Sequence, residues 1–523
     1  MNYDGAARHD HSSRRNAAGR ERNRGFGEKR HYSAAAPSQR KRTSDPARLT
    51  AFQVLRAVSS EDAYANLVLP RKIRENHLNK QDAGFATELT YGALREQGLY
   101  DAVLQQCVDR PLTALDAPVL DALRLGAHQL LSMRVPAHAA LDETVSLVRS
   151  QVGTGPSGLV NAVLRKVSRQ TREEWVEQLT ARVSDESEEL AITYSHPEWI
   201  VRAFRQSLAA HGRDVAELEQ LLDADNAAPV VNLVALPGLG DLDEVYKLGG
   251  RKGKFVPGSA YYEGGDVGRL DSVREGVVRV QDAGSQAVAR ALADVALPAG
   301  DSDEEWLDLC AGPGGKASLL AALAAQRGAF LTANEPQAHR ADLVESALEA
   351  VPHNSWQVTD MDGRDYGQDQ TERYFDRIMV DAPCSGLGAL RRRPEARWRK
   401  KLSDVAELTN LQSELLDAAL KAVRVGGVVA YVTCSPHPAE TVAIVEDAIK
   451  KHPNLRVLDT TAALNNVTMT APTAPGHEYA SSASSVSEWT GNSIQLWPHV
   501  NKTDAMFLTL LTVEESTHAT EES

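Results

Sequence analysis

The sequence predicts an α/β fold with a doubly wound parallel sheet over residues 276–515, preceded by an all-helical region. Three short apolar segments, 306–307, 378–380 and 428–432, have the character of buried strands. Each ends in a polar or glycine-rich turn, and helical patterns separate them, which is the alternation that builds a parallel sheet. Ligands gather beyond the carboxyl ends of strands in such sheets, so these turns form the candidate site.

Composition limits the class of protein. A chain of 523 residues is long enough for about two to four domains. Its 42% hydrophobic and 24% charged residues are typical of soluble globular proteins. No apolar stretch approaches the ~20 residues that span a membrane, and no apolar run follows the N-terminal charges, so we expect a cytoplasmic protein. Four cysteines are too few for a disulfide framework, and their spacing indicates no metal site.

The pattern along the chain divides it into successive parts. We expect a disordered basic arm at 1–45, a helical region at 46–180, a small α+β connector at 185–275 and the α/β domain at 276–515, which carries a surface loop at 466–490. The helical region is predicted from the spacing of its apolar residues, since Leu120, Leu123, Ala127 and Leu130 fall on one helix face. The basic arm serves either as an RNA contact or as a solubilising tail.

The turn after the first strand has the composition of a nucleotide-binding corner. Residues 308–316 read Asp-Leu-Cys-Ala-Gly-Pro-Gly-Gly-Lys and precede a helical run at 317–326. Glycines there let backbone N–H groups approach a ligand at a helix N-terminus. The next strand, 330–333, is followed by Glu335, and an acidic residue at that place suits the hydroxyls of a ribose. The polar turn 360–364 is suited to an adenine edge.

Two cysteines follow the other two strands. Cys384 lies in Asp-Ala-Pro-Cys-Ser-Gly and Cys434 in Thr-Cys-Ser-Pro, so we expect both thiols to face one crevice. The sequence alone does not say which thiol is the more reactive. Cys107 and Cys310 are expected to pack as small hydrophobic residues.

The charge is unevenly distributed. A net charge of −14 argues against a general nucleic-acid surface, but the segment 391–401 is strongly basic and begins soon after Cys384. Basic groups bind phosphates through local placement as much as through total charge. We predict that Arg391, Arg392 and Arg397 contact RNA; the alternative is a solvated charged face.

Taken together, the motifs resemble those of RNA cytosine-C5 methyltransferases. The turn 310–316, the Asp-Ala-Pro-Cys-Ser-Gly segment and the Thr-Cys-Ser segment carry this resemblance. Segments 135–138 and 158–165 resemble the NusB-like RNA-binding domain at the front of the bacterial 16S ribosomal RNA members, the Sun/Fmu type. The resemblance covers about residues 46–515 and implies a Rossmann-like fold that uses S-adenosylmethionine, with 16S ribosomal RNA as partner. Separately, we expect no metal and a monomer.

The resemblance also implies roles for individual residues. Cys434 would be the nucleophile and Cys384 would assist release of the product. Asp381 would hydrogen-bond the cytosine edge, and Lys316 would stabilise charge on the base or lower a thiol pKa. The residues expected around the methyl donor are Ala311, Gly312, Pro313, Gly314, Gly315, Lys316, Glu335, Arg340, Asp362 and Asp381.

Three other functions remain open on the sequence. A transfer RNA could replace ribosomal RNA as the substrate of the same reaction. The chain could be a non-catalytic RNA-binding or assembly factor built on the NusB-like region, although the intact turn and both cysteines argue against this. A DNA cytosine methyltransferase would use the cysteine that follows proline, and the Thr-Cys-Ser segment points away from that class.

Overall fold

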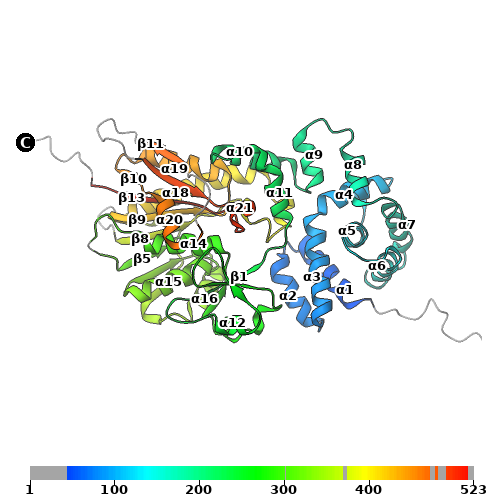
Figure 1. Cartoon of the computed structure of the whole chain (residues 1–523), viewed down its shortest axis with the longest axis horizontal. Coiled ribbons are helices and arrows are strands. Elements are labelled where there is room, and N and C mark those ends of the chain that lie inside the picture. Colours follow the sequence, from blue (N-terminus) through cyan, green and yellow to red (C-terminus); the bar gives the residue numbers. More distant parts are fainter. Residues whose placement is uncertain (1–43, 301, 369–373, 471–476, 481–489, 516–523) are drawn as a thin grey trace, which may run out of the picture. The chain divides into compact units, whose positions relative to one another are not determined.

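The helical region begins where the described part of the chain begins. The structure, a computed structural model, describes residues 44–300, 302–368, 374–470, 477–480 and 490–515 (Figure 1). The predicted basic arm lies outside the described residues except for its last two, and so does most of the predicted loop at 466–490. Among the residues described, no helix is long and apolar enough to cross a bilayer.

Eight α-helices and the short helix η2 (Leu112–Ala114) make up the region from 46 to 180 (Figure 1). The α-helices are α1 (Pro46–Ser60), α2 (Ala65–Glu75), α3 (Lys80–Arg95), α4 (Gln97–Cys107), α5 (Ala117–Leu131), α6 (Ala137–Gln151), α7 (Ser157–Val167) and α8 (Arg172–Thr180). Side-chain caps start several of them: Asp45 accepts from the N–H of Arg48, and Thr171 and Glu174 form a capping box. The predicted apolar stripe lies on α5, where Leu123 is fully buried.

The predicted connector has a helical half and a sheet half. The helices are α9 (Glu186–Thr193), α10 (Glu198–Ala210), α11 (Leu218–Asn226), α12 (Asp243–Lys247) and α13 (Asp271–Arg274). The strands are β1 (Val231–Ala235), β2 (Arg251–Lys252), β3 (Ser259–Tyr262) and β4 (Val278–Val280). They form an antiparallel sheet in the order β2-β3-β1-β4, and β4 lies just past the predicted end of the connector at 275. Helices α9 to α11 continue the helical part of the chain beyond the predicted limit at 180.

The α/β domain is built on a second, larger sheet. Its strands are β5 (Glu305–Asp308), β6 (Phe330–Asn334), β7 (Trp356–Thr359), β8 (Phe375–Asp381), β9 (Val423–Thr433), β10 (Leu455–Val457), β11 (Glu478–Ala480), β12 (Thr490–Gln495) and β13 (Phe507–Val513). The order is β11-β12-β13-β9-β8-β5-β6-β7, with β10 paired to β13. Strands β7, β6, β5, β8 and β9 are parallel, as predicted.

The remaining strands make the sheet mixed rather than purely parallel. β13 runs antiparallel to β9, to β10 and to β12. Only a short connection containing α21 (Pro498–Asn501) separates β12 from β13. Parallel neighbours need a crossover of a dozen or more residues, so a connection this short favours the antiparallel pairing.

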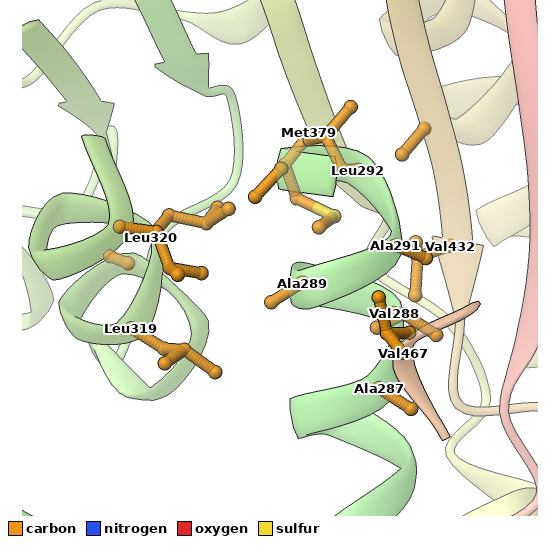
Figure 2. Close-up of a cluster of buried hydrophobic side chains, with 14 of the residues drawn as sticks. Ala287, Val288, Ala289, Ala291, Leu292, Leu319, Leu320, Met379, Val432 and Val467 are labelled. Carbon is orange, nitrogen blue, oxygen red and sulfur yellow. The ribbon is translucent and has the colours of Figure 1, made fainter. Parts of the chain in front are cut away.

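Helices cover the larger sheet and hold its central strands. They are α14 (Ala283–Asp294), α15 (Gly315–Arg327), α16 (Ala338–Leu348), α18 (Leu402–Ala422), α19 (Val442–Lys451) and α20 (Thr460–Val467), whereas the short helix α17 (Ala396–Arg399) contacts the helical region. Figure 2 shows Ala291 of α14 beside Val432 of β9, and Leu292 beside Met379 of β8. These contacts bury the strand residues just before the two cysteine segments, so the strand ends that carry the thiols are fixed by the core.

Candidate active site

The two cysteine segments meet at the carboxyl edge of the larger sheet. Strands β8 and β9 are parallel neighbours, with Asp381 paired to Val432. Cys384 and Cys434 follow these strands, and their sulfur atoms lie 3.3 Å apart. Both side chains are partly buried. The thiols that lie 50 residues apart in the sequence therefore form one pair in space.

An ion pair lies next to the thiols. Lys316 comes from the start of α15 and Asp381 from the end of β8, and Lys316 Nζ donates to Asp381 Oδ2 at 2.8 Å. Burial lowers the pKa of Lys316, but the charges of Asp381, Cys434 and Asp308 outweigh burial and hold the pKa above its usual value. The Lys316 side chain therefore stays protonated and places a positive charge beside the thiols.

The two thiols are chemically unequal. The hydrogen bond between the two thiols lowers the pKa of Cys434; burial and the charge of Asp381 oppose this, and Lys316 supports it. The same hydrogen bond, together with burial, raises the pKa of Cys384. A thiolate is the nucleophilic form of cysteine, and the lowered pKa favours that form at Cys434 rather than at Cys384.

The glycine turn joins β5 to α15 beside this pair. Gly314 has φ of +98°, and a Cβ there would lie 2.4 Å from the Cβ of Ala347. A Cβ on Gly312 would lie 2.0 Å from Oε2 of Glu335. Gly314 therefore requires glycine for conformation and for space, and a side chain at position 312 would displace the Glu335 carboxylate. Around them, Ala311 is buried, Pro313 is exposed and Gly315 opens the helix.

The acidic end of β6 faces the glycine turn. Glu335 is buried; its Oε1 accepts from the N–H of Gln337 at 3.1 Å, and its Oε2 lies 3.2 Å from the guanidinium of Arg340. Arg340 also donates to the carbonyl of Gly312 at 2.8 Å. The predicted ribose residue and its predicted support are thus in direct contact with the turn.

The turn 360–364 is tied to the same edge. Asn334 donates to the carbonyls of Leu309 and Met361, at 3.2 and 3.0 Å. Asp362 caps the short helix η6 (Gly363–Asp365), and hydrogen bonds from Arg364 hold the pKa of Asp362 below its usual value. The three segments expected around the methyl donor therefore lie together.

Asp308 is a residue of this site to which the sequence motifs assigned no role. It ends β5, it is fully buried, and no side chain of the described structure donates a hydrogen bond to its carboxylate. Burial raises its pKa to about 7, the charge of Asp381 adds to the rise, and Lys316 opposes it. The sequence feature that could have identified Asp308 as a site residue is its position at a strand end, directly before the glycine turn.

These groups fit the predicted S-adenosylmethionine. That molecule carries ribose hydroxyls and positive charge, and the buried carboxylates of Asp308 and Glu335 complement those features. The close approach of backbone at Gly312 suits a ligand that packs on the turn. Within the ranges that the structure describes, no group of three or more His, Cys, Asp or Glu residues is arranged to hold a metal ion.

The predicted RNA-contacting arginines need a correction. Arg397 is fully buried and donates to the carbonyls of Arg95 and Ser195, at 3.2 and 3.1 Å. Arg391 is also buried and donates to the carbonyl of Lys502 at 3.1 Å. Guanidinium groups committed in this way are not available to a phosphate, so the prediction of RNA contact is wrong for both.

Arg392 differs from its two neighbours in the prediction. Its side chain is 38% exposed while Nε donates to the carboxylate of Asp504 at 2.8 Å. This ion pair, counteracted by burial, raises the pKa of Arg392 above its usual range. RNA contact by Arg392 stays a prediction.

Comparison with known proteins identifies two matching regions. Residues 45–169 match the NusB family, and residues 295–512 match the family described as 16S rRNA methyltransferase RsmB/F. A solved structure of the protein PH0851 has a TM-score of 0.72 and 20% identity, covering 90% of this chain and 99% of that one. At that identity the likeness concerns the fold.

Sequence relatives extend the match over most of the chain. A Mycobacterium tuberculosis protein, classed by the general term methyltransferase, is 46% identical over 474 residues, which are 90% of this chain and 97% of that protein. The ribosomal RNA small subunit methyltransferase B of Erwinia tasmaniensis is 31% identical over 426 residues, 79% of this chain and 92% of that protein. The chain belongs to the RsmB/F family of 16S rRNA methyltransferases, and it is an RNA methyltransferase that uses S-adenosylmethionine.

Proposed function

We propose that this methyltransferase modifies C5 of a cytosine in 16S ribosomal RNA, with Cys434 as a covalent nucleophile. The observation that carries the proposal is the pair of unequal thiols, 3.3 Å apart at the ends of β8 and β9. The 16S substrate is supported by the family match, by relatives named for the small-subunit RNA, and by the NusB-like region.

The first step activates the base. C5 of cytosine is a poor nucleophile, and addition of the Cys434 thiolate to C6 turns the ring into an enamine-like nucleophile at C5. The electron pair of the C5–C6 double bond shifts to C4–C5 and negative charge develops at N3; Asp381 would hydrogen-bond the base, and Lys316 would offset the charge. Bound S-adenosylmethionine supplies the methyl group as an electrophilic sulfonium.

The second step releases the product. A base takes the proton from C5, the C5–C6 double bond forms again, and the Cys434 sulfur leaves as thiolate. The Cys384 thiol lies 3.3 Å from that sulfur and donates a hydrogen bond to it as the negative charge returns. In this proposal Cys434 forms the covalent bond in the first step, and Cys384 assists the breaking of that bond in the last.

The target must leave its stack to reach such a pocket. Enzymes that act on a base either extrude it from the helix or work on unpaired nucleotides. Sequence-specific RNA recognition likewise favours loops and opened segments. We therefore expect the modified cytosine to lie in a loop or in locally opened 16S RNA.

Single-thiol variants test the proposal. We expect Cys434→Ser to abolish methyl transfer to a 16S transcript and the covalent protein–RNA adduct. We expect Cys384→Ser to accumulate that adduct, because release is impaired. Labelled methyl transfer, denaturing gels and bisulfite mapping of the RNA measure the three quantities.

A matched control and an opposite result complete the test. Cys107→Ala changes a buried cysteine of the helical region and should leave methylation unchanged. An adduct that survives in Cys434→Ser and disappears in Cys384→Ser would reverse the two roles. Methylation of transfer RNA in place of the 16S transcript would refute the substrate.

A further inference from the structure

A buried carboxylate lies directly behind the two cysteine segments. Glu440 ends the short helix η8 (Pro438–Glu440), and its side chain is fully buried. It accepts from the N–H and hydroxyl of Ser385, at 2.7 and 2.6 Å. It also accepts from the hydroxyl of Ser435 at 2.6 Å and the amide of Gln412 at 3.1 Å. A carboxylate offers about four lone-pair positions, so this one is fully used.

The donors belong to the residues that follow the two cysteines. Ser385 comes directly after Cys384, and Ser435 comes directly after Cys434. The serine hydroxyls also lie within hydrogen-bond distance of each other, at 3.2 Å. Both cysteine segments are therefore bonded to one carboxylate, and displacement of that carboxylate would move one thiol relative to the other.

Further hydrogen bonds fix the carboxylate and the other flank of Cys384. The amide of Gln412 on α18 also donates to the carbonyl of Pro383 at 2.8 Å. The hydroxyl of Tyr431 on β9 donates to the backbone carbonyl of Glu440 at 2.9 Å. Cys384 is thus held from both sides, and Glu440 is held by the strand that leads to the second thiol.

The negative charge of this carboxylate also acts on Cys384. The hydrogen bond with Cys434 and burial are the main causes that raise the pKa of Cys384, and the charges of Cys434 and Glu440 add to them. Glu440 thus contributes to the raised pKa of Cys384, and hence to the difference between the two thiols. Geometry and charge therefore act in the same direction.

We propose that Glu440 is a positioning residue, which holds the two cysteine segments together at Ser385 and Ser435 and thereby sets the contact between the two sulfurs. It acts through the serines rather than on the substrate. The catalytic use of the contact rests on the proposed function, whereas the contact itself is a property of the protein without RNA.

Crosslinking of the thiols measures their separation. Diamide takes two electrons and two protons from the thiol pair and leaves a Cys384–Cys434 disulfide, whose rate of formation depends on the distance and orientation of the sulfurs. Misplacement by about 1 Å can cost on the order of 100-fold in rate, so we expect Glu440→Ala to slow the crosslink at least 10-fold. Glu440→Gln keeps an acceptor for Ser385 and Gln412 and should stay within about threefold of the wild type.

Alkylation of the thiols measures the effect of the charge. Iodoacetamide labelling of the full chain across pH, followed by peptide mass spectrometry, gives the labelling rate of each thiol. The midpoint of Cys384 or Cys434 is the pH at which its labelling rate reaches half of the maximum. Removal of the Glu440 charge should bring the two midpoints closer by about one pH unit in both variants. A role confined to folding would change the melting temperature and leave both midpoints in place.

Strand β8, which leads to Cys384, offers a matched control. Asp376 is a buried carboxylate near the opposite end of β8, where it accepts from the N–H groups of Glu304 and Glu305 at 2.6 and 2.9 Å. We expect Asp376→Asn to lower the melting temperature without changing the crosslink rate or the midpoints. The comparison separates loss of a buried carboxylate from loss of this particular one.

The outcomes are distinct. A folded Glu440→Ala protein with the wild-type crosslink rate and midpoints would overturn the proposal. If Glu440→Ala does not fold, unchanged midpoints in Glu440→Gln overturn it instead. If Cys434→Ser still methylates RNA while the Glu440 variants show the expected changes, the proposed function fails and the positioning role stands.

Discussion

Two segments of this chain are rich in basic residues but lie in different environments. The segment 391–401 holds two buried arginines, Arg391 and Arg397. In the turn 251–254, all three basic side chains are exposed, and two of them lie on strand β2 at the edge of the small sheet. The difference shows that the partners of a basic group, rather than the local density of charge, decide whether it can meet a phosphate.

The buried segment connects the cysteine segment to the helical region. The guanidinium of Arg399 donates to the carbonyls of Val58 and Ala63, both at 2.7 Å. In the same segment, Glu395 accepts from the N–H of Ala65 at 2.9 Å. Because this segment follows Cys384 closely, the helical region is anchored to the part of the chain that carries one of the thiols.

The largest expected effect is on stability at Arg397. Its guanidinium donates to the carbonyl of Arg95 in the helical region and to that of Ser195 in the connector. It also donates to Asn226 Oδ1 at 2.8 Å and to the carbonyl of Asp225 at 3.3 Å. Arg397→Ala leaves these acceptors without a partner, so we expect a loss of about 3–5 kcal/mol in the free energy of unfolding, measured by urea titration with circular dichroism.

The exposed turn supplies the control for that loss. Lys252→Ala changes a solvated side chain and should stay within about 0.5 kcal/mol of the wild type. A loss at Arg397 no greater than the loss at Lys252 would mean that the buried segment contributes little, and the contrast between the two segments would fail.

A smaller effect should appear in the pH dependence of stability. Asp225 is fully buried beside Arg397; burial raises its pKa to about 7, and the charge of Arg397 opposes the rise. The folded chain therefore binds a proton that the unfolded chain releases at its ordinary pKa of about 4. The stability from this group is present at low pH and is lost as the pH rises from about 4 to 7.

The variant Asp225→Asn removes that titration. From pH 5 to pH 8 we expect the wild type to lose about 2 kcal/mol in the free energy of unfolding relative to the variant, because Asn carries no proton to release. Asp223→Asn, at an exposed position of the same helix, should follow the wild type. Parallel pH profiles for wild type and Asp225→Asn would show that Asp225 titrates normally.

Much of the active-site arrangement was predictable because it depends on local patterns. Apolar runs that end in polar turns marked β5, β8 and β9, and parallel pairing brings the ends of such strands to one edge. The sequence could therefore indicate that Cys384 and Cys434 face each other. It could not indicate their different pKa shifts, which arise from a hydrogen bond between them and from Lys316.

The surroundings of Arg397 and of Glu440 could not be predicted, because they depend on contacts between distant parts of the chain. The carbonyl of Arg95 that accepts from Arg397 lies 302 residues away, and no local pattern marks an unpaired carbonyl as a future partner. The position of Glu440 behind both thiols likewise follows from Ser385, 55 residues earlier. The sequence shows that the segment 391–401 is basic. The burial of Arg391 and Arg397 determines that these two arginines bind carbonyls within the protein.

The smallest expected effect is on RNA affinity at the exposed turn. Each phosphate contact releases condensed counterions, so removal of one contact lowers the slope of log affinity against log salt by about 0.7–0.9. We expect Lys252→Ala and Lys254→Ala each to weaken binding of a 16S transcript a few-fold, with that change in slope and an unchanged melting temperature. Lys450→Ala, an exposed position on α19, is the matched control. If all three variants bind alike, exposure alone does not make the turn an RNA contact, and the basic character of β2 then serves only to keep an edge strand solvated.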